Sequence, residues 1–345
     1  MLVWFVEHKT PIQIDRTKDH VMDSAYNYLR TINIKRRYSP LKLLVDSGAY
    51  TAARKKIELD PYKIIEIQER LGSDIAVPLD YPFMPYMTFE EMKKRWIKTI
   101  ENTKLWVEVL NPRIDVMPMI HALNKKNLEE TIKIISRIAE NSDIVGLGTI
   151  VDPTFTLKGF LSDRQPRKEL FEMLLYAIMK VKEFGYKVHV TGFGSSPLTL
   201  HIGLYMGVDS TDSSGYRRKA AYGKIVLPFT GERYIGNGKA TFGVSMLSKK
   251  ELKFIKEKCQ CPVCSSNPHL LWKDWRARAI HNEWVIKQEL KKGLKLLNEG
   301  LDIYEKYLDK LFLRSSLWHL WKYIKTQLKY KKLHEYSPNV ITMIS

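Results

Sequence analysis

Cysteine is scarce in this chain of 345 residues: there are three, Cys259, Cys261 and Cys264, all within six positions. The scarcity excludes a disulfide framework, and the clustering makes a metal site the first hypothesis. Long apolar runs are also absent, since Met1–Val6 is far shorter than the roughly 20 residues of a bilayer-spanning helix. No basic segment precedes that run, so no secretion signal is predicted. We therefore expect a cytoplasmic protein with no part in the membrane.

Acidic residues are too few to balance the basic ones. Against 56 Lys and Arg there are 38 Asp and Glu, which leaves a formal net charge of +18. This excess favours a polyanionic partner, because each phosphate that a protein neutralises releases a condensed counterion. A lysine-rich, solvated surface is the alternative, and charge alone leaves both open. Disorder is excluded, since 44% of the residues are hydrophobic and suffice for one large core or two ordinary ones.

The order of strands and helices predicts a parallel sheet, because short β-branched runs alternate with helical stretches long enough for a crossover. The predicted strands are Leu43–Val45, Ile75–Leu79, Val116–Ile120, Ile144–Leu147 and Val188–Val190, and the predicted helices are Pro61–Leu71, Thr88–Val109, Leu128–Ala139 and Arg167–Phe184. The spacing leaves room for about eight such units, which favours an α/β fold of the (β/α)8 TIM-barrel type with its site at the carboxyl ends of the strands. A doubly wound open sheet is the alternative, although no G-x-G-x-x-G follows the first strand.

Polar side chains stand directly after several apolar runs. They are Asp46, Asp80, His121, Asp209 and Asp212, the last two following Met206–Val208, which we also expect to be extended. Each one alone could cap a helix or serve as a hydrogen-bonded structural carboxylate. Several that converge at one end of a barrel instead predict an active site there.

The spacing C-x-C-x-x-C brings three thiolates into one tight turn, which suits a tetrahedral zinc ion with a fourth ligand from nearby. His269 and His281 are the candidates, with four and 16 residues respectively between them and Cys264. Four would strain the turn, so we predict that His281 completes the shell. A full Cys3His shell leaves no position for water, and the zinc is therefore expected to be structural. Three free cysteines clustered by chance are the alternative.

The composition changes near residue 245. A Lys-rich helix and the cysteine cluster come next, and a long helical segment follows from about Glu283 to Tyr336. We therefore predict a TIM-barrel catalytic domain (1–245), a zinc-binding subdomain (246–284) and a basic helical C-terminal segment (285–345).

The C-terminal segment is strongly basic: residues 310–332 contain seven Lys or Arg and no Asp or Glu. At about 100° per residue one apolar stripe forms, which we expect to pack on the barrel. It comprises Leu313, Leu317, Leu320, Ile324 and Leu328. An adjacent face with Trp318 and Trp321 predicts nucleic-acid binding through phosphate contacts and aromatic stacking. Its basic residues are Lys322, Lys325, Lys329 and Lys332. A solvated helix face with buried tryptophans is the alternative.

Four short motifs follow one another along the chain. They are D-S-G-A-Y at Asp46–Tyr50, G-S-D-I with a later Asp at Gly72–Asp80, G-V-D-S-T-D at Gly207–Asp212, and the cysteine cluster with His281-Asn282. In this order they resemble the tRNA-guanine transglycosylase superfamily over about residues 40–285. The resemblance implies a (β/α)8 barrel with a zinc subdomain that exchanges a guanine in a nucleic acid for a 7-deazaguanine base such as preQ0.

The resemblance also implies roles for single residues. Asp212 would be the nucleophile and Asp46 the proton-transferring carboxylate. This suits the chemistry, because replacing a base with retained configuration requires two displacements and a group that moves a proton. Asp80 would recognise the guanine edge through charge-assisted hydrogen bonds, and Tyr50 would stack on the base. The complete set of implied base-binding residues is Ser47, Tyr50, Asp80, His121, Gly148, Thr149 and Gly192.

The sequence departs from the superfamily pattern in three places that concern the substrate. His121 stands where a glutamine is usual, Thr191 where a stacking methionine is expected, and Ser213–Arg218 does not match the bacterial C-V-x-P-T-R run. Within that last stretch, Arg217 and Arg218 are predicted to bind the phosphates that flank the target base.

The expected nucleic acid is DNA. Archaeal tRNA enzymes of this superfamily carry RNA-binding domains after the zinc region, whereas about 60 residues follow it here. In this respect the chain resembles the DpdA-like DNA-guanine transglycosylase branch. A tRNA substrate is the first alternative, and a non-catalytic nucleic-acid-binding partner subunit is the second. The oligomeric state is left open, with a homodimer as one option.

Overall fold

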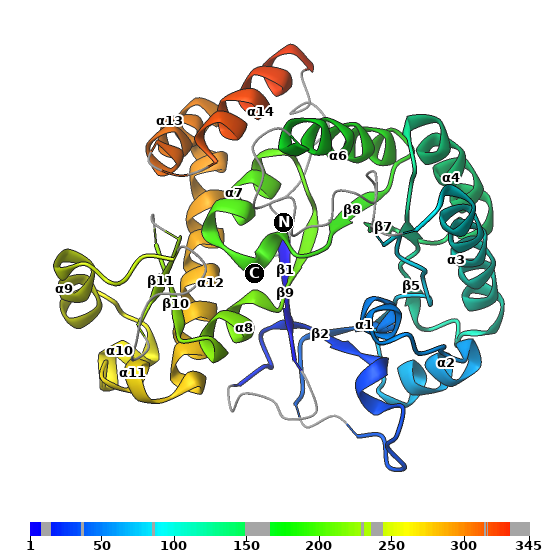
Figure 1. The fold of residues 1–345 in the computed structure, drawn as a ribbon, viewed down its shortest axis with the longest axis horizontal. Helices are drawn as coiled ribbons and strands as arrows, with labels where there is room; N and C mark the ends of the chain where they lie inside the picture. Colours follow the sequence, from blue (N-terminus) through cyan, green and yellow to red (C-terminus); the bar gives the residue numbers. More distant parts are fainter. Residues whose placement is uncertain are drawn as a thin grey trace.

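The computed structural model describes residues 1–7, 15–35, 38–84, 87–148, 166–228, 231–235, 244–313, 315 and 317–331, the side chains of 166–170 and 329–331 excepted. Within these residues a central sheet is surrounded by helices, and a helical lobe lies beside it (Figure 1).

The central sheet consists of parallel strands. They are β1 (Leu2–Val6), β2 (His20–Ser24), β3 (Lys42–Asp46), β4 (Ile75–Ala76), β5 (Asp115–Val116), β6 (Met119–Ile120), β7 (Ile144–Leu147), β8 (Lys187–Val190) and β9 (Ser210–Ser213). Their order in space is β5-β4-β3-β2-β1-β9-β8-β7-β6, and every neighbouring pair is parallel.

The sheet closes on itself through the segment Asp115–Ile120. Within it, the amide of Met117 donates to Ala76 on one side at 2.9 Å, and the carbonyl of Pro118 accepts from Gly146 on the other side at 2.8 Å. β5 and β6 are therefore two halves of one strand, interrupted where proline lacks an amide hydrogen. The nine labelled strands thus occupy eight barrel positions, and the predicted TIM barrel is confirmed.

The five strands predicted from β-branched runs are all present. The sequence did not identify β1, β2 or β9; β2 mixes polar with apolar residues, and all four residues of β9 are polar. The expectation that Met206–Val208 is extended is wrong: Met206 ends a helix, and Gly207 has φ +76°, a left-handed turn that favours glycine. Asp209 consequently lies at the amino end of β9, where its carboxylate accepts from the Val188 amide at 2.8 Å.

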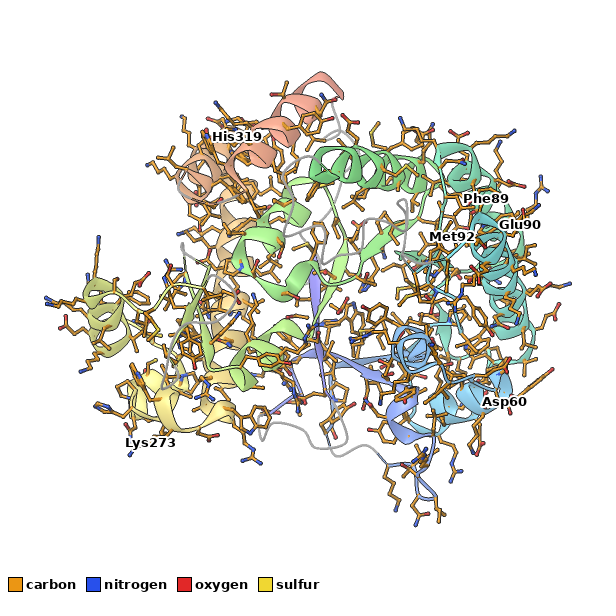
Figure 2. The ribbon with its side chains drawn as sticks, in the orientation of Figure 1. Asp60, Phe89, Glu90, Met92, Lys273 and His319 are labelled. Carbon is orange, nitrogen blue, oxygen red and sulfur yellow. The ribbon has the colours of Figure 1, made fainter. Side chains whose placement is uncertain are left out.

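Helices cover the outside of the barrel. Up to residue 221 they are α1 (Ala49–Lys55), α2 (Pro61–Arg70), α3 (Phe89–Val109), α4 (Lys125–Ile138), α6 (Pro166–Glu183), α7 (Pro197–Tyr205) and α8 (Gly215–Ala221), with short 3-10 turns η1 (Ala25–Tyr28) and η2 (Phe193–Ser195). Their starts follow from capping chemistry. Asp60, at the edge of the molecule in Figure 2, accepts from the Tyr62 amide at 3.0 Å and begins α2. Thr88 and Glu91 form a capping box that begins α3.

Alternation along β3 shows which side chains face the barrel interior. Leu43 and Val45 pack outward with residues of α2, whereas Leu44 packs inward with Trp4 of β1. Two residues further along, Asp46 falls on the inward side at the carboxyl end of β3. The apolar interior therefore ends in polar side chains at this mouth of the barrel.

The lobe beside the barrel is built from the hairpin β10 (Lys224–Leu227) and β11 (Gly231–Tyr234) with α9 (Lys249–Glu257), α10 (Pro262–Ser266), α11 (Leu270–Lys273) and α12 (Trp275–Glu299). The long helix α12 packs on α8 and on α7, so it joins the lobe to the barrel. The predicted domain boundary at residue 285 lies inside α12.

Two more helices follow, α13 (Leu301–Phe312) and α14 (Trp318–Lys331), where the sequence suggested one long segment. The apolar stripe of α14 packs on the barrel helices as predicted, through Leu317, Leu320, Ile324 and Leu328. The prediction is wrong for Leu313, which is 59% exposed because it lies in the turn after α13. No helix in the described part of the chain is long and apolar enough to cross a membrane.

Candidate active site

Strand register brings the predicted site residues to one mouth of the barrel. Trp4 faces the interior and pairs with Asp212 of β9, so Asp212 faces inward as well. On the opposite side of the barrel Met119 faces inward, which places His121, two residues later, on the same side at the strand end. Met119 pairs with Gly146, so Gly148 takes the equivalent inward position after β7. Side chains from separate strands therefore converge, as the sequence predicts.

Asp46 is held at the end of β3 by a tight turn. Gly48 has φ +85°, and its amide donates to Asp46 Oδ2 at 2.9 Å. A Cβ at Gly48 would lie 2.2 Å from Tyr26 Cβ, so only glycine fits this turn. Burial, together with the negative charges of Asp80 and Asp212, raises the pKa of Asp46 to about 7. This mutual repulsion places the three carboxylates in one electrostatic environment.

Asp80 forms a buried polar cluster with neighbours from two other strand ends. His121 Nε2 lies 2.8 Å from Asp80 Oδ2, and the hydroxyl of Ser47 donates to Asp80 Oδ1 at 3.5 Å. The imidazole of His121 packs directly over Gly148, where a Cβ would lie 2.4 Å from its Cε1. Position 148 thus requires glycine, and His121 occupies the space beside the carboxylate that the sequence assigns to guanine recognition.

Asp212 accepts the Gly192 amide on Oδ1 at 2.7 Å, which explains why the loop after β8 carries a glycine with φ +79°. Sequence reasoning missed a third residue here, His189 of β8. Its Nε2 lies 3.7 Å from Asp212 Oδ1, and its Nδ1 lies 2.8 Å from Ser210 Oγ. The available signal was a histidine inside an apolar strand, three residues before Gly192.

The other positions that the sequence relates to base binding differ in their exposure, and one is not described by the structure. Tyr50 lies in the first turn of α1, directly after the Asp46 turn, and is 59% exposed, so its side chain is accessible to a ligand. Thr191, which stands where the superfamily pattern has a methionine and is not one of the predicted base-binding residues, is partly buried in the loop after β8. Thr149 lies outside the described residues.

The cysteine cluster and His281 form a compact donor set. The nearest ligand atoms of Cys259, Cys261, Cys264 and His281 all lie within 4.8 Å of one another, and all four residues are buried. His281 Nδ1 faces the sulfurs at 3.3 to 3.7 Å, while its Nε2 lies 3.0 Å from the Val226 carbonyl. That second contact fixes the ring so that Nδ1 is the ligand atom. His269 is exposed, so the choice of His281 from sequence agrees with the geometry.

Of the two arginines after Asp212, one is exposed and one is not. Arg218 is exposed on α8, whereas Arg217 is buried and donates to the Glu7 carboxylate. Glu7 also accepts from Arg16, whose guanidinium binds Glu283 of α12 at 2.6 Å. Arg217 therefore belongs to a buried ion-pair cluster that ties the amino-terminal segment to α8 and α12. Arg218 remains the candidate for phosphate contact.

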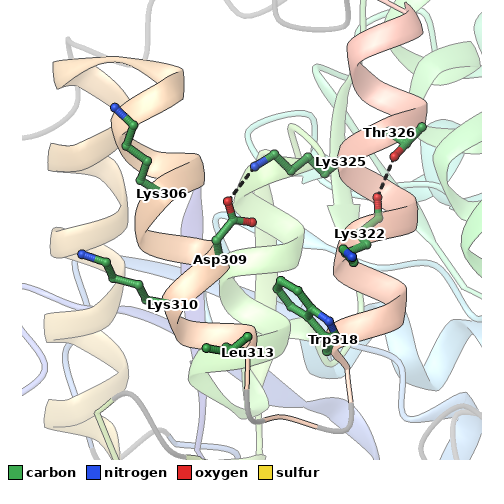
Figure 3. A pocket seen from close by; sticks show the side chains of 8 residues that line it. All are labelled: Lys306, Asp309, Lys310, Leu313, Trp318, Lys322, Lys325 and Thr326. Atoms are coloured by element: carbon green, nitrogen blue, oxygen red, sulfur yellow. Dashed lines mark hydrogen bonds and ion pairs between the residues drawn. The ribbon is translucent and has the colours of Figure 1, made fainter.

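Lys322 and Lys325 of α14 border a groove of about 570 Å³ between α13 and α14 (Figure 3). Lys325 points between the helices and pairs with Asp309 at 2.8 Å and Glu305 at 3.2 Å, so its charge is neutralised within the protein. Lys322 lies at the exposed rim, 5.2 Å from the ring centre of Trp318. Trp321 is fully buried in the core. The side chain of Lys329 and residue Lys332 lie outside the described part of the chain.

Comparisons with known proteins agree on one family. A family model described as queuine tRNA-ribosyltransferase matches residues 37–300. The tRNA-guanine(15) transglycosylase of Aeropyrum pernix is 28% identical over 273 residues, 76% of this chain and 47% of that protein. The enzymes of the same name from Pyrococcus abyssi and Pyrobaculum aerophilum are 29% and 27% identical, over 74% and 94% of this chain. This chain spans 40% and 63% of the length of those last two relatives.

Proposed function

Because the chain belongs to the queuine tRNA-ribosyltransferase family, we propose that it is a guanine transglycosylase that exchanges a guanine in tRNA for a 7-deazaguanine base such as preQ0. The observation that carries the proposal is the convergence of Asp46, Asp212 and the Asp80 cluster on the inner side of one barrel mouth. The three relatives are tRNA enzymes by name, which favours tRNA over the DNA substrate expected from the sequence.

Asp212 is the nucleophile of the proposed reaction. The Gly192 amide holds Oδ1, which leaves Oδ2 to attack C1′ of the target nucleotide. The new bond between Oδ2 and C1′ forms as the bond between C1′ and the guanine nitrogen breaks. The incoming base then displaces the carboxylate, so that two inversions retain the configuration at C1′.

Asp46 moves the proton that this exchange requires. The departing guanine must gain a proton at the nitrogen that leaves C1′, and the incoming base must lose one from the equivalent nitrogen. A carboxyl group with a pKa of about 7 is present in both protonation states near neutral pH and can serve both steps. The Gly48 amide keeps this carboxyl group oriented toward the mouth.

Asp80 and its neighbours recognise the base. A carboxylate at this position accepts hydrogen bonds from the two adjacent N–H donors of guanine, and an analogue without them would lose these charge-assisted bonds. Ser47 and His121 hold the carboxylate. The Gly148 amide already donates to the Ile120 carbonyl at 3.0 Å, so it is not available to a base carbonyl as the sequence suggested. The exposed ring of Tyr50 offsets part of the unstacking free energy, a few kcal/mol, when the target base leaves its helix.

The metal in the proposed function is zinc, held by the three cysteines and Nδ1 of His281. Three sulfurs and one imidazole nitrogen are a zinc donor set, and with four protein ligands the ion serves structure. Asn282 extends this role, because its side chain accepts from the Val226 amide at 2.7 Å and donates to the Tyr216 carbonyl at 3.0 Å. The site thereby supports α8, the helix that follows Asp212.

Phosphates of the nucleic acid are proposed to contact Arg218 near the mouth and Lys322 at the rim of the α13–α14 groove. Both side chains are exposed. Lys325 contributes less than the sequence suggests, because two carboxylates already pair with it.

A trapping experiment tests the function. The protein is incubated with tRNA and, separately, with duplex DNA, each with labelled preQ0, and the products are separated on denaturing gels. We expect label in tRNA, released guanine and a covalent protein–tRNA adduct for the wild type and for Asp115→Asn, an exposed carboxylate away from the mouth. Asp212→Ala should give no adduct. Exchange in DNA alone would reassign the substrate, and binding of tRNA without any exchange would support a non-catalytic partner subunit.

A further inference from the structure

His189 is a buried histidine for which the reaction described above has no role. Its side chain is completely buried on β8. Its Nε2 has no hydrogen-bond partner among the described residues, although it faces the Asp212 carboxylate at 3.7 Å. A buried polar atom without a partner is destabilising, so its retention beside the nucleophile requires an explanation.

Ser210 decides which nitrogen of His189 carries hydrogen toward Asp212. If Nδ1 carried the only ring proton, the lone pair of Nε2 would face a carboxylate oxygen, which is electrostatically unfavourable. If the Ser210 hydroxyl donates to Nδ1 across their 2.8 Å contact, the proton resides on Nε2 and points at Asp212. His189, Ser210 and Asp212 all face inward in the registered strands β8 and β9, so this chain of three groups is built into the sheet.

We propose that His189 is a positioning residue that holds Oδ1 of Asp212 during base exchange, and this inference rests on the proposed function. A small rotation of the carboxylate brings Oδ1 from 3.7 Å into hydrogen-bond distance of Nε2. Oδ1 then accepts from Nε2–H and from the Gly192 amide, and only Oδ2 is directed at C1′.

The same two donors serve both displacements. When Oδ2 bonds to C1′, Oδ1 becomes the carbonyl oxygen of the ester. When the incoming base displaces the ester, the negative charge returns to the carboxylate and both N–H groups stabilise it. His189 therefore affects the formation and the breakdown of the adduct without touching the sugar or the base.

Two variants separate this role from simple packing. His189→Phe fills a similar volume without a donor, whereas His189→Gln can place an amide N–H near the position of Nε2. We expect His189→Phe to lower the rate of adduct formation by about 10²–10³-fold, the effect of losing one preorganised donor, with an unchanged KM for the free base. His189→Gln should recover at least tenfold of that loss. Equal rates for His189→Phe and wild type, or equal defects in both variants, would overturn the proposal.

A measurement independent of activity reads the tautomer directly. In ¹⁵N-labelled protein, the Nε2 resonance of His189 should be that of a protonated nitrogen and Nδ1 that of an acceptor, and both should shift in Asp212→Asn. A proton found on Nδ1 alone would refute the inference even in an active enzyme. If the wild type forms no adduct at all, the proposed function fails, while the resonances still decide whether His189 donates to Asp212.

Discussion

Replacing Asp46 by asparagine should make the protein more stable above neutral pH. The asparagine side chain is nearly the same size and could still accept from the Gly48 amide, so the substitution removes little besides charge. Burial, followed by repulsion from Asp80 and Asp212, raises the pKa of the native carboxyl group from its ordinary 3.8 to about 7. The wild-type carboxylate is therefore ionised at pH 8 against its surroundings, and the amide of the variant carries no charge.

The sign and size of the effect follow from proton linkage. A carboxyl group whose folded-state pKa lies above its unfolded value binds more protons in the folded state, so its contribution to stability is full below about pH 4 and is lost as the pH rises to about 7. The whole loss corresponds to about 4 kcal/mol, and about 2–3 kcal/mol of it falls between pH 5 and pH 8. Relative to wild type, the free energy of unfolding of Asp46→Asn should rise by this amount across that interval and then level off.

Urea denaturation at several pH values between 5 and 8 measures this difference. Asp115→Asn removes an exposed carboxylate of β5 and should follow the wild type at every pH. Asp46→Asn should at the same time lose base exchange, because no proton donor remains at that position. A stability difference that does not change with pH would show that the mouth does not hold Asp46 in a repulsive environment, and the argument for a shared carboxylate site would fail.

Three further predictions concern other parts of the molecule. Chelation should release about one zinc ion per chain and lower the melting temperature, and Cys261→Ser should purify without the metal, as elemental analysis would reveal. Arg16→Met should reduce the free energy of unfolding by about 3–5 kcal/mol in chemical denaturation, because the buried carboxylates of Glu7 and Glu283 lose the cation they share and keep only Arg217 and Lys287 respectively; a loss below about 1 kcal/mol would contradict this. Lys322→Glu should weaken tRNA binding and flatten its salt dependence, whereas Lys126→Glu, at an exposed position of α4, should do neither. Equal effects of the two substitutions would show that the groove does not take part in tRNA binding.

Sequence reasoning succeeded where one residue type serves one physical purpose. β-branched runs identified β3, β7 and β8, and the cysteine spacing with His281 identified the metal site. It failed at β9, because all four residues Ser210–Ser213 are polar and no hydrophobic pattern marks them. The apolar run Met206–Val208 before it was misinterpreted as extended, because a buried helix end is as apolar as a buried strand: Met206 ends α7 and is buried.

The sequence could not predict which side chains contact one another in the folded protein. Nothing in the residues around Arg217 indicates that it turns inward to Glu7, 210 positions earlier, while Arg218 turns outward. The role of His189 likewise depends on Ser210 and Asp212 lying on the neighbouring strand in one register. Side-chain direction is set by tertiary packing, and a motif that names a residue does not name its partners.

The strand that completes the wall next to Asp212 is the earliest one in the sheet by chain order. β1 pairs with β9, so the barrel closes only when Leu2 at one end of the chain pairs with Ser210, about two hundred residues later. Contacts this distant in the chain form slowly, and until then both strands present bare edges to other molecules. Alterations of Leu2–Val6 that weaken this pairing therefore disturb the backbone that holds Asp212, even though these residues contribute no side chain to the chemistry.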